Sequence, residues 1–159
     1  MLRAVDASTG RPLVDVIADA AEQKGTGRWT VQTALELGVP ASTIAEAVFA
    51  RSASGHVALR AAAREALSGP ATTPLTGADR TRLVDDVRAA LWASKVVAYA
   101  QGLDQIRAGS EAYGWDVDVA EVARIWRGGC IIRARLLERI RAEYAANHLP
   151  TLLAAPGTS

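Results

Sequence analysis

The sequence predicts an all-α fold, a single helical domain of about six to seven helices with one long central helix. Apolar residues recur at spacings of three and four along several stretches, as they do on the buried face of a helix. Glycine and proline separate these stretches at places where helices end. No alternating strand pattern of useful length and no repeat of fixed period is visible.

Composition favours one globular domain and excludes several functions. Half of the 159 residues are apolar, which is enough for one sizeable core. The 18 basic and 17 acidic residues leave a net charge of +1. The protein therefore lacks the large positive potential that would attract nucleic acid or an anionic membrane. No apolar run approaches the roughly 20 residues that cross a bilayer. With Cys130 as the single cysteine and no signal segment at the start, we expect a cytoplasmic protein without disulfides.

The first half of the chain is expected to hold four helices joined by short breaks. They are residues 13–21, 29–37, 43–51 and 57–67. For residues 13–21 the type of secondary structure is ambiguous, and helix is favoured. Gly38 suits the end of the second helix and Pro40 prevents its continuation. Thr43 and Glu46 have the spacing of a capping box at the start of the third.

The second half begins after a linker at residues 68–77. Thr76 and Asp79 are predicted to cap the long central helix, which ends near Gly114. Asp118 and Glu121 are predicted to cap a short helix that runs through Trp126 and breaks at residues 128–129. Beyond that break an apolar residue recurs at every fourth position of the last predicted helix, at Ile132, Leu136, Ile140 and Tyr144.

The two helices on either side of Gly38 have the connectivity of a helix-turn-helix, which raises the possibility of DNA binding. The second of them, however, presents mostly acidic and apolar side chains, with Arg51 as its one basic group. A recognition helix needs several groups that reach phosphates and base edges. We therefore expect no nucleic-acid partner.

The loop at residues 22–27 is the best candidate for chemistry because it lies directly before a helix. Its glycines allow close backbone approach, and Lys24, the Thr26 hydroxyl and the positive helix end can converge on a phosphate. It is not a Walker A loop, since Arg28 stands where the lysine is required. An ordinary turn with a solvated lysine remains the alternative. Arg51 likewise can pair with the last carbonyls of its own helix rather than with a ligand.

Other polar and small residues are given structural roles. The glycine pair within residues 126–130 is expected to let backbones pack closely, with Cys130 as a small buried side chain. His56 and His148 lack metal-ligand spacing, so no metal site is predicted. No acid–base pair, and hence no catalytic residue, is assigned to the remaining carboxylates: Asp85, Asp86, Asp116 and Asp118.

Several long motifs occur in one order along nearly the whole chain. They read QKGTGRWT at residues 23–30, GVP at 38–40, EAVFAR at 46–51, ALWASK at 90–95, YAQG at 99–102, YGW at 113–115 and IWRGGCIIR at 125–133. Together they resemble the helical C-terminal domain of the decarboxylating 6-phosphogluconate dehydrogenases.

This resemblance implies a function and a set of contacts. Enzymes of this family oxidise and decarboxylate 6-phosphogluconate to ribulose 5-phosphate with NADP in the pentose phosphate pathway, usually as homodimers. In the family, the lysine of the QKGTG loop and the arginine that ends the AVFAR segment contact the substrate's phosphate end. These roles fall on Lys24 and Arg51 here, and Thr26 is a weaker candidate for the same anion.

This sequence also departs from the family pattern in several places. Residues 1–159 match part of the C-terminal domain, and the family's N-terminal Rossmann domain, its general base and acid, and its C-terminal tail find no counterpart. Glu22 also stands where the family usually has glycine. We therefore expect a fragment truncated at both ends, inactive alone and binding no cofactor securely, although NADP serves the complete enzyme. The alternatives are a non-enzymatic helical module that pairs with a full-length homologue, or a phosphosugar sensor that uses Lys24 and Arg51.

Overall fold

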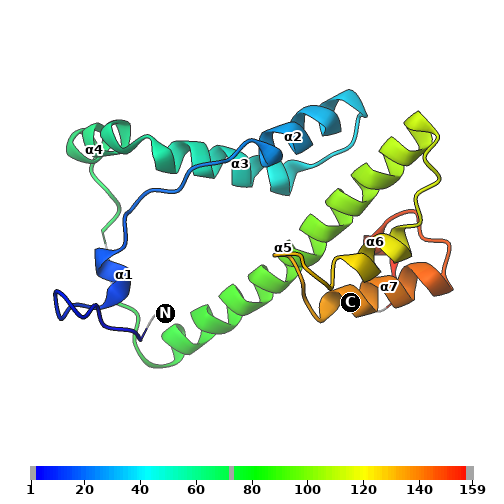
Figure 1. The fold of residues 1–159 in the computed structure, drawn as a ribbon. Coiled ribbons are helices and arrows are strands. Elements are labelled where there is room, and N and C mark those ends of the chain that lie inside the picture. The colour runs from blue at the N-terminus through cyan, green and yellow to red at the C-terminus, as the bar shows by residue number, and fades with distance from the viewer. Residues whose placement is uncertain (1–2, 72–73, 157–159) are drawn as a thin grey trace.

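The structure, a computed structural model, describes residues 3–71 and 74–156. Within these ranges its only strand-like pairing is an isolated bridge between Val5 and Pro12, so the all-α prediction is confirmed. The helices are α1 (Leu13–Val16), α2 (Thr26–Glu36), α3 (Ser42–Gly55), α4 (Val57–Ala66), α5 (Gly77–Tyr113), α6 (Val119–Ile125), α7 (Leu136–Ala146) and the 3₁₀ helix η1 (Leu152–Ala154). In Figure 1, α5 crosses the molecule diagonally, with α2 to α4 in a row on one side and α6 and α7 on the other.

The first helix is shorter than predicted. Residues 13–21 were expected to be helical, but α1 ends at Val16 and Ile17 is already extended. None of the residues of α1 is buried, and the Val14 and Ile17 side chains are about half exposed. A short helix in water depends on packing an apolar face, and in this one Leu13 and Val16 are only partly buried.

The segment that follows α1 is held by side chains from the far end of α3 and from α4. Ser54 Oγ accepts the Ala21 N–H at 3.0 Å, and Arg60 contacts Asp19 at 3.0 Å. The hydrogen bond from Arg60 lowers the pKa of the Asp19 carboxyl below its ordinary value. The chain therefore runs from α1 to α2 along the end of α3, as Figure 1 shows.

Helices α2 and α3 form the predicted pair joined by a short turn, with boundaries that differ from the prediction. Gly38 has φ +68°, a left-handed conformation that glycine adopts without strain, and it ends α2 as expected. α2 begins at Thr26 rather than residue 29, and α3 continues through Gly55 rather than ending at Arg51. Arg51 thus lies one turn before the end of its helix.

The predicted capping box at the start of α3 is wrong. The N-cap position is Ala41, which has no side chain able to cap. A residue of α5 takes this role, because Gln101 Oε1 accepts the Thr43 N–H at 3.0 Å while its amide nitrogen donates to Ser42 Oγ at 3.0 Å. A distant side chain therefore satisfies the helix end, and local spacing carries no sign of it.

The long helix α5 has 37 residues and spans about 55 Å. Thr76 occupies its N-cap without a side-chain hydrogen bond, and Asp79 contacts Arg82 at 2.7 Å, so the predicted capping box is wrong here too. Gly114, with φ +68°, ends the helix as predicted. Residues 77–95 are all exposed, and burial begins at Val96.

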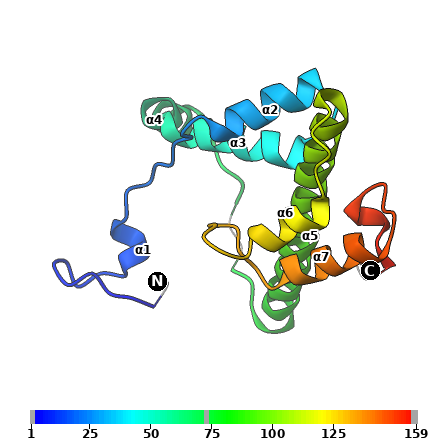
Figure 2. The same cartoon turned by 45° about the vertical axis from the view of Figure 1, so that its right-hand side comes forward.

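The core lies where the second half of α5 meets α6, α7 and η1 (Figure 2). Asp118 caps α6 as predicted, accepting the N–H groups of Ala120 at 2.8 Å and Glu121 at 3.3 Å. The largest fully buried side chains are Leu103, Leu137, Ile140 and Leu152. Burial also raises the pKa of Tyr144, which packs at the edge of this cluster.

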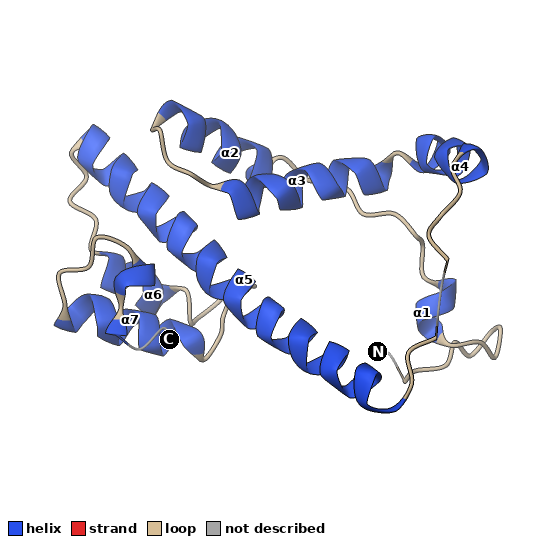
Figure 3. Cartoon of the chain, turned by 180° about the vertical axis from the view of Figure 1, so that it is seen from behind, coloured by secondary structure: helices blue, strands red, loops and turns tan. Residues whose placement is uncertain are grey.

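The last helix starts later than its apolar spacing suggests. α7 begins at Leu136, and Ile132 lies outside it in the connection from α6. Figure 3, coloured by secondary structure, shows this connection as a loop beside α5. The Tyr99 hydroxyl of α5 donates to the Ile132 carbonyl, which fixes the loop against the long helix instead of extending α7. None of the described helices combines the length and apolar character that crossing a bilayer requires.

Candidate functional site

The side chain of Gln23 closes the glycine loop that precedes α2. Gln23 Oε1 accepts the Gly25 N–H at 2.9 Å, and the Gly25 carbonyl accepts the Trp29 N–H at 3.0 Å. Gly25 has φ +102°, which other residues rarely adopt, so the loop needs glycine at this position. The N–H groups of residues 26–28 precede the first intrahelical bond of α2 and remain available at its positive end.

The second glycine of the loop serves a different purpose. Gly27 has no unusual φ, but a Cβ built on it would lie 2.8 Å from Cγ2 of Val48 on α3. Real Cβ atoms do not approach other atoms so closely. The start of α2 therefore lies against α3 only because residue 27 has no side chain, and this contact sets the loop beside the end of α3.

Arg51 on α3 reaches the loop. Its Nε donates to the Glu22 carbonyl at 3.1 Å, not to the carbonyls that end its own helix. Together these two residues border a cavity of about 300 Å³ at the end of α3. The cavity is lined by Glu22, Gln23, Arg51, Ser52, Gly55 and His56.

The three residues predicted to bind phosphate are only partly brought together. Arg51 lines the cavity, whereas Lys24 and Thr26 do not, although Lys24 directly follows the lining residue Gln23. Lys24 is exposed, and no hydrogen bond or ion pair of its side chain occurs within the part of the chain that the structure describes. Thr26 is the first residue of α2, and its carbonyl accepts the Thr30 hydroxyl at 2.9 Å.

Sequence reasoning missed three other lining residues, Ser52, Gly55 and His56. Ser52 Oγ donates to the Val48 carbonyl at 3.1 Å, so it is engaged with its own helix. His56 follows directly on Gly55, where α3 stops and α4 begins, and it is exposed. The predicted helix stopped at Arg51. A prediction that continued it would have placed Gly55 one turn beyond Arg51 on the same face.

The segment between α6 and α7 is held by its backbone conformation and by contacts to α5 and α7. Its predicted close backbone packing is wrong, because a Cβ at Gly128 or Gly129 would meet nothing within 4 Å. Gly129 is required instead by its φ of +70°. Cys130 is partly exposed rather than buried, and together with burial it raises the pKa of Tyr99. Arg127 contacts Glu138 of α7, which ties the loop to that helix.

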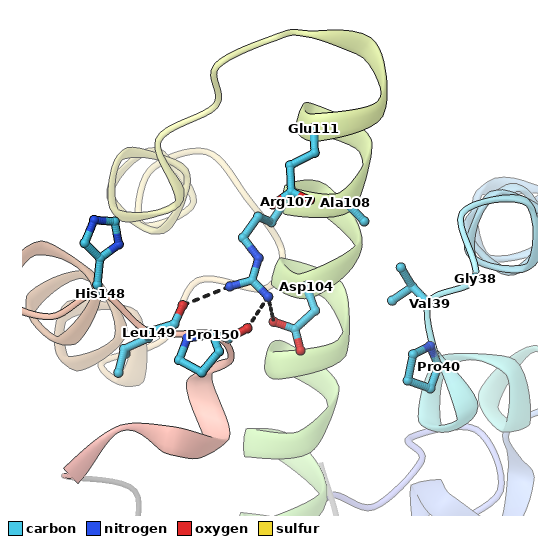
Figure 4. A pocket seen from close by; sticks show the side chains of 10 residues that line it. All are labelled: Gly38, Val39, Pro40, Asp104, Arg107, Ala108, Glu111, His148, Leu149 and Pro150. Atoms are coloured by element: carbon cyan, nitrogen blue, oxygen red, sulfur yellow. Dashed lines mark hydrogen bonds and ion pairs between the residues drawn. The ribbon is translucent and has the colours of Figure 1, made fainter.

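A larger cleft of about 730 Å³ lies elsewhere, around α5 (Figure 4). In this view the turn that holds Val39 faces α5 from one side, and residues 148–150 face it from the other. The cationic group of this cleft, Arg107, donates to the carbonyls of Leu149 and Pro150 and contacts Asp104 at 3.6 Å. These contacts occupy both terminal nitrogens of Arg107, whereas the Nε of Arg51 is its only nitrogen with a hydrogen-bond partner among the described residues.

The fold and this site define an all-helical domain in which a glycine loop and a neighbouring helix border one cavity, with Arg51 as its cationic lining residue. The family model described as "6-phosphogluconate dehydrogenase, C-terminal domain" matches residues 1–159. The chain belongs to this family, and the resemblance read from its motifs is confirmed.

Relatives and a solved structure agree with this assignment. The decarboxylating 6-phosphogluconate dehydrogenase of Synechococcus elongatus is 53% identical over 152 residues, which are 95% of this chain and 32% of that protein. The Escherichia coli enzyme is 50% identical over 92% of this chain and 31% of its own length. The NADP(+)-dependent enzyme of Bacillus subtilis is 52% identical over 87% of this chain and 29% of its own length.

Among solved structures, Plasmodium falciparum 6-phosphogluconate dehydrogenase, described in apo form and with NADP+ or 6-phosphogluconate, superposes with a TM-score of 0.89. It is 38% identical, and the match covers 96% of this chain and 33% of that one. The chain thus spans about a third of the length of the relatives it matches.

Proposed function

We propose that this chain forms part of an NADP-dependent, decarboxylating 6-phosphogluconate dehydrogenase of the cytoplasm, which converts 6-phosphogluconate to ribulose 5-phosphate in the pentose phosphate pathway. Its role is to hold the phosphate end of the substrate with Arg51, Lys24 and Thr26. The observation that carries the proposal is the family match over residues 1–159, within which Arg51 reaches back to the glycine loop and lines a cavity beside it.

The chemistry of this corner suits a phosphate ester. Only the Nε of Arg51 has a hydrogen-bond partner among the described residues, so its terminal nitrogens remain free for the bidentate contact that a guanidinium makes with phosphate. The exposed Lys24 adds a second positive charge next to Gln23, which lines the cavity. The N–H groups at the start of α2 add a positive helix end, a common anion site in proteins.

We further propose that residues 1–159 do not turn over substrate alone. The sequence has no dinucleotide-binding glycine fingerprint, and none of its carboxylates or lysines forms an assigned acid–base pair. Hydride transfer needs the nicotinamide, the substrate and the acid–base groups held in one geometry. NADP therefore serves the complete enzyme, and this chain holds no cofactor securely by itself.

Calorimetric titration of the purified chain with 6-phosphogluconate tests the binding role. Loss of a charged hydrogen bond predicts that Arg51→Ala weakens binding by about tenfold to hundredfold, and Lys24→Ala should weaken it less. Arg80→Ala removes an exposed arginine from α5 and serves as the matched control, which should bind as the unaltered chain does. Equal affinity of Arg51→Ala and Arg80→Ala would refute the assignment. Formation of NADPH by the chain alone would refute the proposed inactivity.

The first half of α5 supports a dimer as the working form. Its apolar side chains Val84, Val87 and Leu91 recur at spacings of three and four on one face and are about half or more exposed. Trp92 on the same half is 46% exposed. An apolar stripe of this length on a soluble domain indicates a protein interface. We propose that a second copy or a family member covers it.

The same stripe favours the second candidate function, a non-enzymatic helical module that pairs with a full-length homologue. Sedimentation of the chain alone and mixed with such a homologue separates the two. Leu91→Glu should abolish self-association if α5 forms the interface, because it places a charge in an apolar contact. Association with the homologue, combined with no binding of 6-phosphogluconate, would favour the module. If the chain stays monomeric both alone and in the mixture with the homologue, neither the dimer nor the pairing module is correct.

A further inference from the structure

The cavity beside Arg51 is lined by an acidic side chain as well as by the Arg51 guanidinium. Glu22 lines it, and the two parts of this residue do different things. Its backbone carbonyl accepts the Arg51 Nε at 3.1 Å and so positions the guanidinium. Its side chain lies over the end of α3, where Cγ is 3.3 Å from the place that a Cβ on Gly55 would take.

The Glu22 carboxylate does not neutralise Arg51. No ion pair within 4.0 Å joins the Glu22 carboxylate to a cation within residues 3–71 and 74–156. The glutamate is exposed, and the absence of a side chain at Gly55 leaves room for it at the wall of the cavity. The last carbonyls of α3 add partial negative charge at the same end. An anion that binds Arg51 here therefore meets a carboxylate as well as a guanidinium.

We propose that Glu22 is a specificity-determining residue of this cavity, whose carboxylate opposes the binding of dianions beside Arg51 and so limits its affinity for a phosphate ester. This inference rests on the proposed phosphate-binding function. Repulsion between like charges grows with the charge of the ligand, so a dianion is opposed more strongly than a monoanion. Because the cavity is open to solvent, the effect is moderate and falls as salt is added.

Side-chain exchange at residue 22 tests the charge without disturbing Arg51, because the contact to Arg51 comes from the backbone. Glu22→Gln keeps the shape and removes the charge, and it should tighten binding of 6-phosphogluconate and of inorganic sulfate by about threefold to tenfold. Glu22→Asp keeps the charge and should restore weak binding. Glu36→Gln makes the same charge change at the other end of α2, roughly 15 Å along the helix, and should change neither affinity.

Calorimetric titrations of the chain and these variants, at low and at high salt, separate the possible results. The gain in Glu22→Gln should shrink at high salt, which a purely structural effect would not do. If Arg51→Ala weakens binding while Glu22→Gln leaves it unchanged, the role of Glu22 is wrong and the phosphate site stands. If Glu36→Gln gains as much as Glu22→Gln, the effect is one of net charge and the role of Glu22 is again wrong. If neither the chain nor Glu22→Gln binds either anion, both proposals fail.

Discussion

Replacing Gly27 by alanine tests the close contact that positions the glycine loop. The added Cβ would lie 2.8 Å from Cγ2 of Val48, so one helix must move or the valine must leave its rotamer. A valine in a helix has one strongly preferred χ1 rotamer and cannot swing aside at little expense. Overpacking of this kind destabilises by about 1–3 kcal/mol, whereas replacing a helical glycine by alanine otherwise gains up to about 1 kcal/mol.

The net expectation for Gly27→Ala is a loss of about 1–2 kcal/mol, which lowers the Tm of a domain of this size by about 2–8 °C. Thermal and urea unfolding followed by far-ultraviolet circular dichroism measures this difference. Because α2 moves relative to Arg51, the affinity for 6-phosphogluconate should fall as well.

Two companion variants make the reasoning refutable. Gly102 lies within α5, and a Cβ there would meet nothing within 4 Å, so Gly102→Ala should stabilise the chain by about 0.5–1 kcal/mol. Adding Val48→Ala to Gly27→Ala removes the clashing methyl group. The double variant should therefore lose less free energy of unfolding than the sum of the losses in the two single variants. If Gly27→Ala is stabilised like Gly102→Ala, the contact between α2 and α3 is looser than described.

Three further measurements test other parts of the fold. Leu137→Ala empties a fully buried position and should lower the free energy of unfolding by about 2–5 kcal/mol, while Leu153→Ala, at a residue that is 52% exposed, should change it by less than about 0.5 kcal/mol; similar losses would contradict the described core. Asp118→Ala removes the cap of α6 and should destabilise by about 0.5–2 kcal/mol in urea unfolding, whereas Asp118→Asn, which can still accept both N–H groups, should lose clearly less. The hydrogen bond from Arg141 and the charge of Arg127 lower the pKa of Glu138 below its ordinary value of 4.5, so the stability that Glu138 contributes is present above that value and is lost as the pH falls through the folded-state pKa. The difference in Tm between the chain and Glu138→Gln should therefore close between about pH 7 and about pH 3, and a constant difference would refute this ion-pair role.

Local sequence rules succeeded where one helix end depends on its own neighbours. Gly38 and Gly114 end their helices because a left-handed residue is needed there, and glycine adopts that conformation without strain. Asp118 caps α6 because its carboxylate reaches N–H groups two and three residues ahead. Such interactions lie within a few residues, so the spacing of residue types is enough to predict them.

The same rules failed where a distant element decides the outcome. The predicted caps at Thr43 and Thr76 do not form, and at Thr43 the reason is the Gln101 side chain of α5, which satisfies the helix start from 58 residues away. Residues 17–21 are not helical, and the segment is held instead by polar contacts from α3 and α4, from Ser54 to Ala21 and from Arg60 to Asp19. The long helix α5 was predicted to be central, yet its apolar residues are exposed in its first half.

In the candidate site, too, local features were predictable from the sequence and contacts between distant residues were not. The sequence by itself determined the all-helical class and the glycine loop before a helix, and its family motifs named Lys24, Thr26 and Arg51 as candidates, because these depend on residue type and short spacing. Only the tertiary structure decided that Arg51 is held by the backbone of Glu22 and shares a cavity with its carboxylate. The physical reason is that the two residues are 29 positions apart in the sequence. The missing side chain of Gly27 lets the start of α2, which follows the loop of Glu22, lie close against α3, which carries Arg51.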